Sequence, residues 1–162
     1  MKLRLWYGIV FNLLLAALVI SGAVIYVVFI KGGAQVLEIR DTGSGKIYGK
    51  WFLEEDEEFA VEFIHSVNQS PVREFYQAGG GMLRPIAVRF SSFGAGMQSD
   101  LEEGQTLSRD GDALVISGFN ASFKELNYIV GTVSDHLLII EGETISLREL
   151  CGRNAHITMR LE

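Results

Sequence analysis

The stretch EFAVEFIHSVNQSPVREFYQ, residues 58–77, contains the pattern that decides the fold. In its first half, Phe59, Val61 and Phe63 stand at every second position, and a period of two places them on one face of a β-strand. The polar residues between the two halves favour a turn, because their side chains can bond to the local backbone. Pro71 opens the second half, where a missing N–H is tolerated. The stretch therefore predicts a β-hairpin.

Short runs rich in β-branched and aromatic residues continue on both sides of this hairpin. Turn signals such as DTGSG, RDGD and EGE separate them, and this spacing is typical of an all-β sandwich or barrel. We expect a mainly antiparallel β domain over residues 36–162, with one helical turn near Leu147, and the sequence leaves sandwich and barrel open. The runs are residues 36–40, 46–53, 58–66, 72–77, 86–92, 113–119, 126–133, 136–142, 144–147 and 156–161.

The N-terminal part of the chain is of a different kind. Residues 6–30 carry no charge and no proline, and roughly 20 such residues cross the hydrocarbon core of a membrane as a helix. The small residues 21–23 are followed by further apolar residues, unlike the end of a cleaved signal peptide. We expect a leader at 1–5, an uncleaved transmembrane anchor at 6–30 and a linker at 31–35.

The charge of the chain bears on location and partners. A short positive leader containing Lys2 and Arg4 is expected to stay in the cytoplasm, which places the β domain outside it. Without these two residues the chain keeps 12 of its 14 basic residues against 20 acidic ones. This balance argues against a nucleic-acid partner and against binding of the domain to an anionic membrane surface.

One face of the expected anchor suggests a partner helix. At about 100° per residue, five residues fall on the same side. Small residues let helices approach closely in lipid, and an asparagine can bond across helices. We therefore expect this face to contact another membrane helix. Its residues are Gly8, Asn12, Ala16, Val19 and Ala23.

The central hairpin also holds the residues from which a catalytic triad would have to be built, Ser66, His65 and Glu74. Adjacent residues on a strand point to opposite faces, so the imidazole does not easily reach the serine hydroxyl. No Gly-x-Ser-x-Gly elbow is present either. We expect no enzyme activity and no catalytic residue. A His–Glu pair that locks the hairpin and a contact site for a partner or ligand remain as alternatives.

Metal and cofactor sites are not expected. The three histidines, His65, His136 and His156, lie on three different predicted strands. Cys151 is the only cysteine, so it can form no intramolecular disulfide and no cysteine cluster for a metal. We expect it to be a small buried apolar residue.

Three segments, in this order and spacing, carry a resemblance to a known family. They are IHSVNQSPVREFY (residues 64–76), SSFGAGM (91–97) and DHLLIIEGETISLREL (135–150). Together they resemble a bacterial family of unknown function, small membrane-anchored proteins encoded beside TAXI-type TRAP (tripartite ATP-independent periplasmic) transporters. The resemblance covers roughly residues 36–161.

The resemblance implies an accessory subunit of a secondary transporter for small organic acids. Its helix would dock on the multi-spanning permease in the bacterial inner membrane, and its periplasmic domain would stabilise the complex or position the substrate-binding protein. The alternative is a membrane-tethered module that binds a small ligand without a transporter. The resemblance supplies no catalytic residue, and the positions expected to contact a partner or ligand are His65, Ser66, Glu74, Phe93, Gly94 and Gly96.

Overall fold

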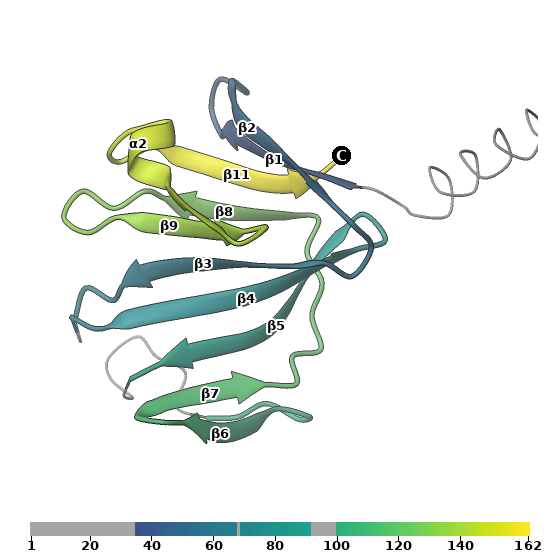
Figure 1. Cartoon of the computed structure of the whole chain (residues 1–162), viewed down its shortest axis with the longest axis vertical. Coiled ribbons are helices and arrows are strands. Elements are labelled where there is room, and N and C mark those ends of the chain that lie inside the picture. The colour runs from purple at the N-terminus through teal and green to yellow at the C-terminus, as the bar shows by residue number, and fades with distance from the viewer. Residues whose placement is uncertain (1–34, 68, 92–99) are drawn as a thin grey trace, which may run out of the picture. The chain divides into compact units, whose positions relative to one another are not determined.

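The computed structural model of the protein describes residues 35–67, 69–91 and 100–162, which form eleven strands and a short helix (Figure 1). β1 begins at Gln35, inside the segment expected to be a linker. The elements are β1 (Gln35–Asp41), β2 (Ile47–Leu53), β3 (Glu58–Ile64), β4 (Pro71–Gly79), β5 (Met82–Phe90), β6 (Thr106–Asp110), β7 (Ala113–Ser117), β8 (Glu125–Ile129), β9 (His136–Ile140), β10 (Glu143–Ser146), α2 (Leu147–Cys151) and β11 (His156–Leu161).

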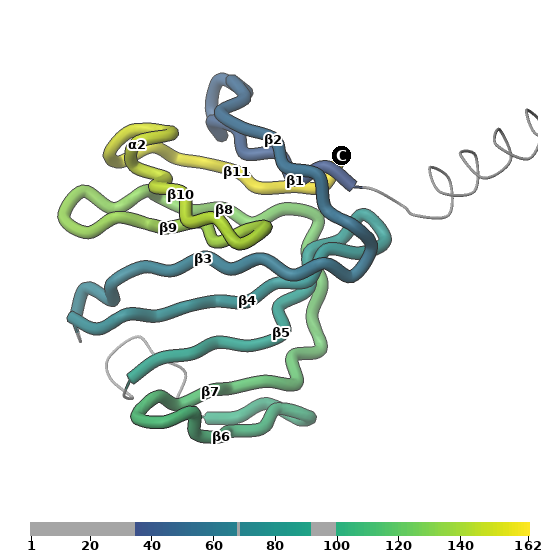
Figure 2. The backbone as a smooth tube through the Cα atoms, in the orientation of Figure 1, coloured from purple at the N-terminus to yellow at the C-terminus, as the bar shows by residue number. Residues whose placement is uncertain are grey.

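The strands form two antiparallel sheets. The order is β2-β1-β11-β8 in the four-stranded sheet and β10-β9-β3-β4-β5-β7-β6 in the seven-stranded sheet, as the backbone trace also shows (Figure 2). An isolated bridge joins Leu83 at the start of β5 to Phe123 just before β8, through two backbone hydrogen bonds of 2.8 Å. The expected antiparallel all-β fold is therefore confirmed, as is the helical turn at Leu147.

The main core is built from both sheets, which is a sandwich arrangement. Alternate residues of each strand face inward, as in Phe59 and Val61 of β3, which are 2% and 0% exposed. The core also takes in Leu147, so that α2 closes one side of it. Its members are Leu37, Ile39, Leu53, Phe59, Val61, Tyr76, Ala78, Leu83, Leu126, Val130, Leu138, Ile140, Leu147, Ile157 and Met159.

A second, smaller cluster lies along the seven-stranded sheet. It joins Val72, Phe90, Leu114 and Ile116, which come from β4, β5 and β7. The strand register places Val72, Phe90 and Leu114 in one row across these strands. The apolar face of this sheet therefore extends beyond the main core.

β6 is the strand that the sequence did not predict. All five of its residues are exposed, so it has no alternation of apolar and polar side chains. β6 forms because its backbone pairs with the edge of β7. The turn that connects the two strands contains Gly111, which has a φ of 59°. The turn signal RDGD, residues 109–112, is confirmed as the turn of the β6–β7 hairpin, and backbone pairing with β7 accounts for the strand before it.

The expected anchor, residues 6–30, lies outside the described residues. Within residues 35–67, 69–91 and 100–162, no helix has the length and apolar character needed to cross a membrane.

The core makes a direct prediction for stability. Leu138 is 0% exposed, whereas Leu107 of β6 is 43% exposed. We expect Leu138→Ala to lower the free energy of unfolding by about 2–5 kcal/mol, because it removes buried methyl groups and leaves a cavity. Leu107→Ala, the control, is expected to change it by less than about 0.5 kcal/mol. Urea unfolding followed by tryptophan fluorescence measures both, and equal losses would contradict this core assignment.

Candidate functional site

The turn between β3 and β4 is closed by His65. Its backbone N–H donates to the Ser70 carbonyl at 2.9 Å, and its own carbonyl accepts from the Gln69 N–H at 2.9 Å. Its Nδ1 atom accepts from the Val67 N–H at 3.3 Å. Ser66 is an exposed residue of this turn. The predicted hairpin is confirmed, and His65 takes part in its turn through both backbone and ring.

The register of the hairpin separates His65 from Glu74. Val61 is the residue opposite Glu74, and Ile64 pairs with Pro71 at the end of the strands. His65 lies beyond this last pair, so the side-chain pair suggested by the sequence does not match the register. The expectation that these two side chains lock the hairpin is wrong, because Glu74 lies inside β4 opposite Val61, whereas His65 lies in the turn.

The other predicted contact residues lie outside the described residues. These are Phe93, Gly94 and Gly96 in the segment 92–99, and the anchor face Gly8, Asn12, Ala16, Val19 and Ala23. Their roles stay predictions.

Glu74 instead binds two tyrosines in the space between the sheets. Its Oε2 atom accepts from the Tyr128 hydroxyl at 2.6 Å and from the Tyr76 hydroxyl at 3.1 Å. The two hydroxyl oxygens are 2.9 Å apart. Val72, Glu74 and Tyr76 stand at every second position of β4 and so share one face of the strand. Val72 and Tyr76 are buried, so Glu74 also faces inward. Since Tyr128 belongs to β8 and Glu74 to β4, this cluster connects the two sheets.

Both tyrosines of this cluster are held in the protonated form. Burial, followed by the charge of the Glu74 carboxylate, raises the pKa of Tyr76 well above its usual range. The same causes, with the neighbouring Tyr76, raise the pKa of Tyr128. Each hydroxyl therefore remains a hydrogen-bond donor at neutral pH, which is what a half-buried carboxylate requires.

His136 adjoins this cluster from the first position of β9. Its ring stacks on Phe63 with 5.1 Å between centroids and meets the Tyr128 ring edge-on at 6.1 Å. The Gly131 N–H donates to its Nδ1 atom at 3.1 Å, so this nitrogen acts as an acceptor. Burial lowers the pKa of His136; the Asp135 carboxylate opposes this effect and the Arg148 guanidinium adds to it.

A serine and an aspartate lie close by, but their bonds are structural. The Ser146 hydroxyl donates to Asp135 and accepts from the Glu149 N–H at 3.0 Å, which caps helix α2. The other oxygen of Asp135 accepts from the Arg148 N–H at 3.0 Å. Arg148 in turn donates to the Gly131 carbonyl at 3.1 Å. These bonds fix the β8–β9 loop that presents Gly131 to His136.

The sequence did not single out Tyr128 or Asp135, and it considered His136 only as a metal ligand. A signal for Tyr128 was present, because it stands between the apolar Leu126 and Val130 at a period of two. All three side chains face the core region in the structure. Their contact with Glu74 depends on strand order, which that period does not contain.

The described residues hold no group of three or more His, Cys, Asp and Glu side chains suited to a metal ion. Cys151 is half-buried and packs against the main core, as expected for a small apolar residue. Burial raises the pKa of its thiol to about 11, so it stays protonated at neutral pH. The Glu74–Tyr76–Tyr128 cluster joins the two sheets through hydrogen bonds.

Comparison with known proteins yields one match. A family model described as a domain of unknown function (DUF1850) matches residues 59–147, which is more than half of the chain. The matched part runs from β3 to the start of α2 and so contains Glu74, Tyr128 and His136. No curated protein and no solved structure matches the chain.

The bond between Tyr128 and Glu74 can be tested by removing one oxygen atom. We expect Tyr128→Phe to lower the free energy of unfolding by about 1–3 kcal/mol, because it leaves a half-buried carboxylate with one donor fewer. Tyr48→Phe is the matched control, since the Tyr48 hydroxyl makes only a 3.3 Å bond to Asp41, and its effect should stay below about 0.5 kcal/mol. Equal effects in urea unfolding would show that the Glu74 cluster does not hold the sheets together.

His136 predicts a pH dependence of stability. The unfolded chain takes up a proton on this residue with a pKa of about 6.5, whereas burial lowers the pKa in the folded protein. The unfolded state therefore binds more protons just below this pH, and stability is lost as the pH falls. We expect His136→Asn, whose amide oxygen can still accept from Gly131, to flatten the stability profile between about pH 5 and pH 8.

The exposed His156 of β11 supplies the control for this measurement. His156→Asn makes the same substitution at an exposed position, and it should leave the profile unchanged. A His136→Asn profile as steep as that of the unaltered protein would assign the pH dependence to other groups.

Proposed function

The chain belongs to the DUF1850 family, and on this premise we propose that it is an accessory membrane subunit of a TAXI-type TRAP transporter for small organic acids. In this role residues 6–30 anchor it in the bacterial inner membrane and dock on the permease. The β domain lies in the periplasm and stabilises the complex or positions the substrate-binding protein. No bond-making step is part of the proposal.

The observation that carries this proposal is a group of exposed apolar side chains at one end of the β domain. Ile64, Val67 and Val133 are 38%, 61% and 92% exposed. Single exposed apolar residues are ordinary, but a group of them is typical of a protein contact. Phe63 pairs with His136, which brings the β8–β9 loop beside the β3–β4 turn, and Figure 1 shows both at the same end of the domain.

This apolar end lies opposite the point where the chain enters the domain. Gln35 pairs with Leu53, next to the turn that leads into β3, and β3 then runs to Ile64 at the other end. A partner bound at the Val67 and Val133 loops would therefore leave the entry point clear. This suits a subunit that is tethered at one end and contacts a soluble protein, such as a substrate-binding protein, at the other.

Co-purification from native membranes tests the proposal. We expect the full-length protein to recover a stoichiometric multi-spanning permease in mild detergent. Asn12→Leu with Ala16→Leu should reduce this recovery severalfold, because bulky side chains prevent close helix packing. Val67→Ser with Val133→Ser should instead reduce recovery of the substrate-binding protein. Mass spectrometry of the recovered proteins measures both.

The controls make similar changes at other positions. Val10→Leu with Ala17→Leu alters the opposite side of the expected anchor, and Leu107→Ser alters an exposed residue of β6. Both should leave recovery unchanged. A wild-type protein that purifies without a permease would refute the accessory role and favour a free tethered module.

A further inference from the structure

The outer face of the seven-stranded sheet, which is turned away from the main core, has an uncharged band at its centre. One row of residues crosses five neighbouring strands without a charge. Three of its members, Ile139, Ala60 and Phe75, line a hollow of about 180 Å³. The row consists of Ile139 of β9, Ala60 of β3, Phe75 of β4, Ala87 of β5 and Ser117 of β7.

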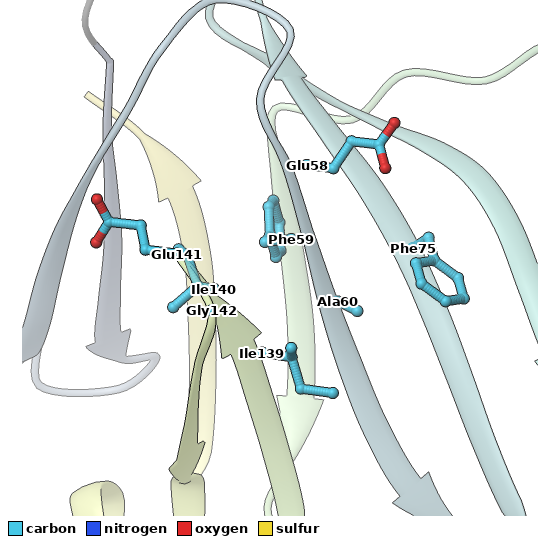
Figure 3. A pocket seen from close by; sticks show the side chains of 8 residues that line it. All are labelled: Glu58, Phe59, Ala60, Phe75, Ile139, Ile140, Glu141 and Gly142. Atoms are coloured by element: carbon cyan, nitrogen blue, oxygen red, sulfur yellow. The ribbon is translucent and has the colours of Figure 1, made fainter.

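The side chains around the hollow show which residues share this outer face (Figure 3). Glu58, Ala60 and Ile139 point to the side of the strands on which the Phe75 ring lies, whereas Glu141 points to the opposite side. Phe75 is only half-buried. Its strand, β4, is the fourth of the seven strands in the sheet. The middle of the outer face is therefore an apolar surface that is open to water.

The charged residues of this face are divided by β4. In each of the two rows that flank the uncharged band, the neighbour of β4 is acidic on the β3 side and basic on the β5 side. These residues share the face of the band, because they stand two positions from it along β3 and β4. In β5 a register shift opposite Phe75 adds one residue between Arg84 and Ala87. The two rows are Glu58–Gln77–Arg84 and Glu62–Arg73–Arg89.

We propose that a second copy of this chain binds to this face, with a two-fold axis parallel to β4. Such an axis brings the β3 side of one copy over the β5 side of the other, because β4 lies between these strands. Glu58 then faces Arg84 of the second copy, and Glu62 faces Arg89 of the second copy. Each contact occurs twice, as in any isologous interface. The face is thus complementary to itself in charge.

The other possible axis for two stacked copies runs along the uncharged band, perpendicular to the strands. It would place Glu58 over Glu62 of the second copy, because these residues lie on opposite sides of the band in the same strand. It would likewise place Arg84 over Arg89. Like charges that face one another in an interface are unfavourable. The charges of this face therefore favour the axis parallel to β4.

The centre of the interface is apolar. Phe75 lies on the axis and meets Phe75 of the second copy, while Ala60 faces Ala87. The hollow beside the ring leaves room for the second ring, so that the two rings pack side by side. Arg73 also lies on the axis, but its guanidinium binds Glu62 of its own chain at 2.7 Å. The two Arg73 side chains therefore lean to opposite sides of the axis.

The place where the chain enters the domain agrees with this axis. β1 begins at Gln35, and its side-chain oxygen accepts from the Gly81 N–H at 2.9 Å, next to the β4–β5 turn. Rotation about an axis parallel to β4 leaves this end of the domain at the same end of the dimer. Two chains anchored in one membrane require such an arrangement. The inference is compatible with the proposed function but does not rest on it.

Sedimentation equilibrium of the full-length protein in neutrally buoyant detergent tests the dimer without a transporter. We expect reversible self-association that weakens when the salt is raised from about 0.05 M to about 0.5 M. Glu58→Lys and Arg84→Glu, each made alone, should weaken it about tenfold or more, because each brings like charges together twice. An equimolar mixture of the two variants should restore the association, since every facing pair of a mixed dimer again has opposite charges.

Glu125→Lys and Arg153→Glu are the matched controls, because they reverse the charge of exposed residues outside this face. Both should leave the association unchanged. An unaltered protein that stays monomeric, a dimer that survives Glu58→Lys, or a mixture of the two variants that stays monomeric would each overturn the proposed interface. Restored association in the mixture also shows that both variants are folded.

Cross-linking of single cysteines locates the axis. Gln77 lies on β4 and faces Gln77 of the second copy. A bis-maleimide of about 8 Å reach should join two Gln77→Cys chains, because packed sheets lie about 10 Å apart. Ile129→Cys, at a position 55% exposed on β8 of the other sheet, is the control and should give no linked dimer. Both variants carry Cys151→Ala, which removes the native thiol.

Equal linking of the two cysteines would place the contact elsewhere and overturn the proposal. Both measurements use the purified protein. The dimer can therefore be established even where the permease co-purification fails, and the reverse also holds.

Discussion

The hydrogen bond between Tyr128 and Glu74 is the contact on which the rest of this domain depends. It places a carboxylate on the inner face of one sheet and its main donor on the other, 2.6 Å apart. A carboxylate in such a place is unfavourable unless it is hydrogen-bonded. The bond therefore favours the relation of the two sheets that brings Tyr128 of β8 next to Glu74 of β4. Packing of the apolar residues alone would specify that relation less sharply.

The central hairpin could be predicted because its information is local. Phe59, Val61 and Phe63 show their common face in the sequence itself, and Pro71 marks the start of the next strand. β6 could not be predicted, since all its side chains are exposed and only the backbone of β7 requires it. The partner of Glu74 is 54 residues away. Such a contact follows from strand order, which period and turn signals leave undetermined.

For the same reason, the polar residues of a sequence do not show which of them are free to bind a partner. Glu74 attracted attention as a possible contact, yet its Oε2 atom already accepts from two tyrosine hydroxyls. Glu58 belongs to an acidic run that looks like an ordinary solvated turn. It is nevertheless Glu58, with Glu141 from a distant turn, that flanks an apolar hollow. Whether a carboxylate is free to bind a partner depends on the donors that the fold places beside it. The fold places two tyrosine hydroxyls beside Glu74.

β3 connects two surface features of the domain. Glu58 at its start borders the hollow, and Ile64 at its end belongs to the exposed apolar group. The two positions are about 20 Å apart along an extended strand. β3 lies between β4 and β9 and contributes the fully buried Val61 to the core, so this spacing is rigid. The exposed apolar group at the end of β3 is therefore carried by a strand that is hydrogen-bonded on both sides, to β4 and to β9.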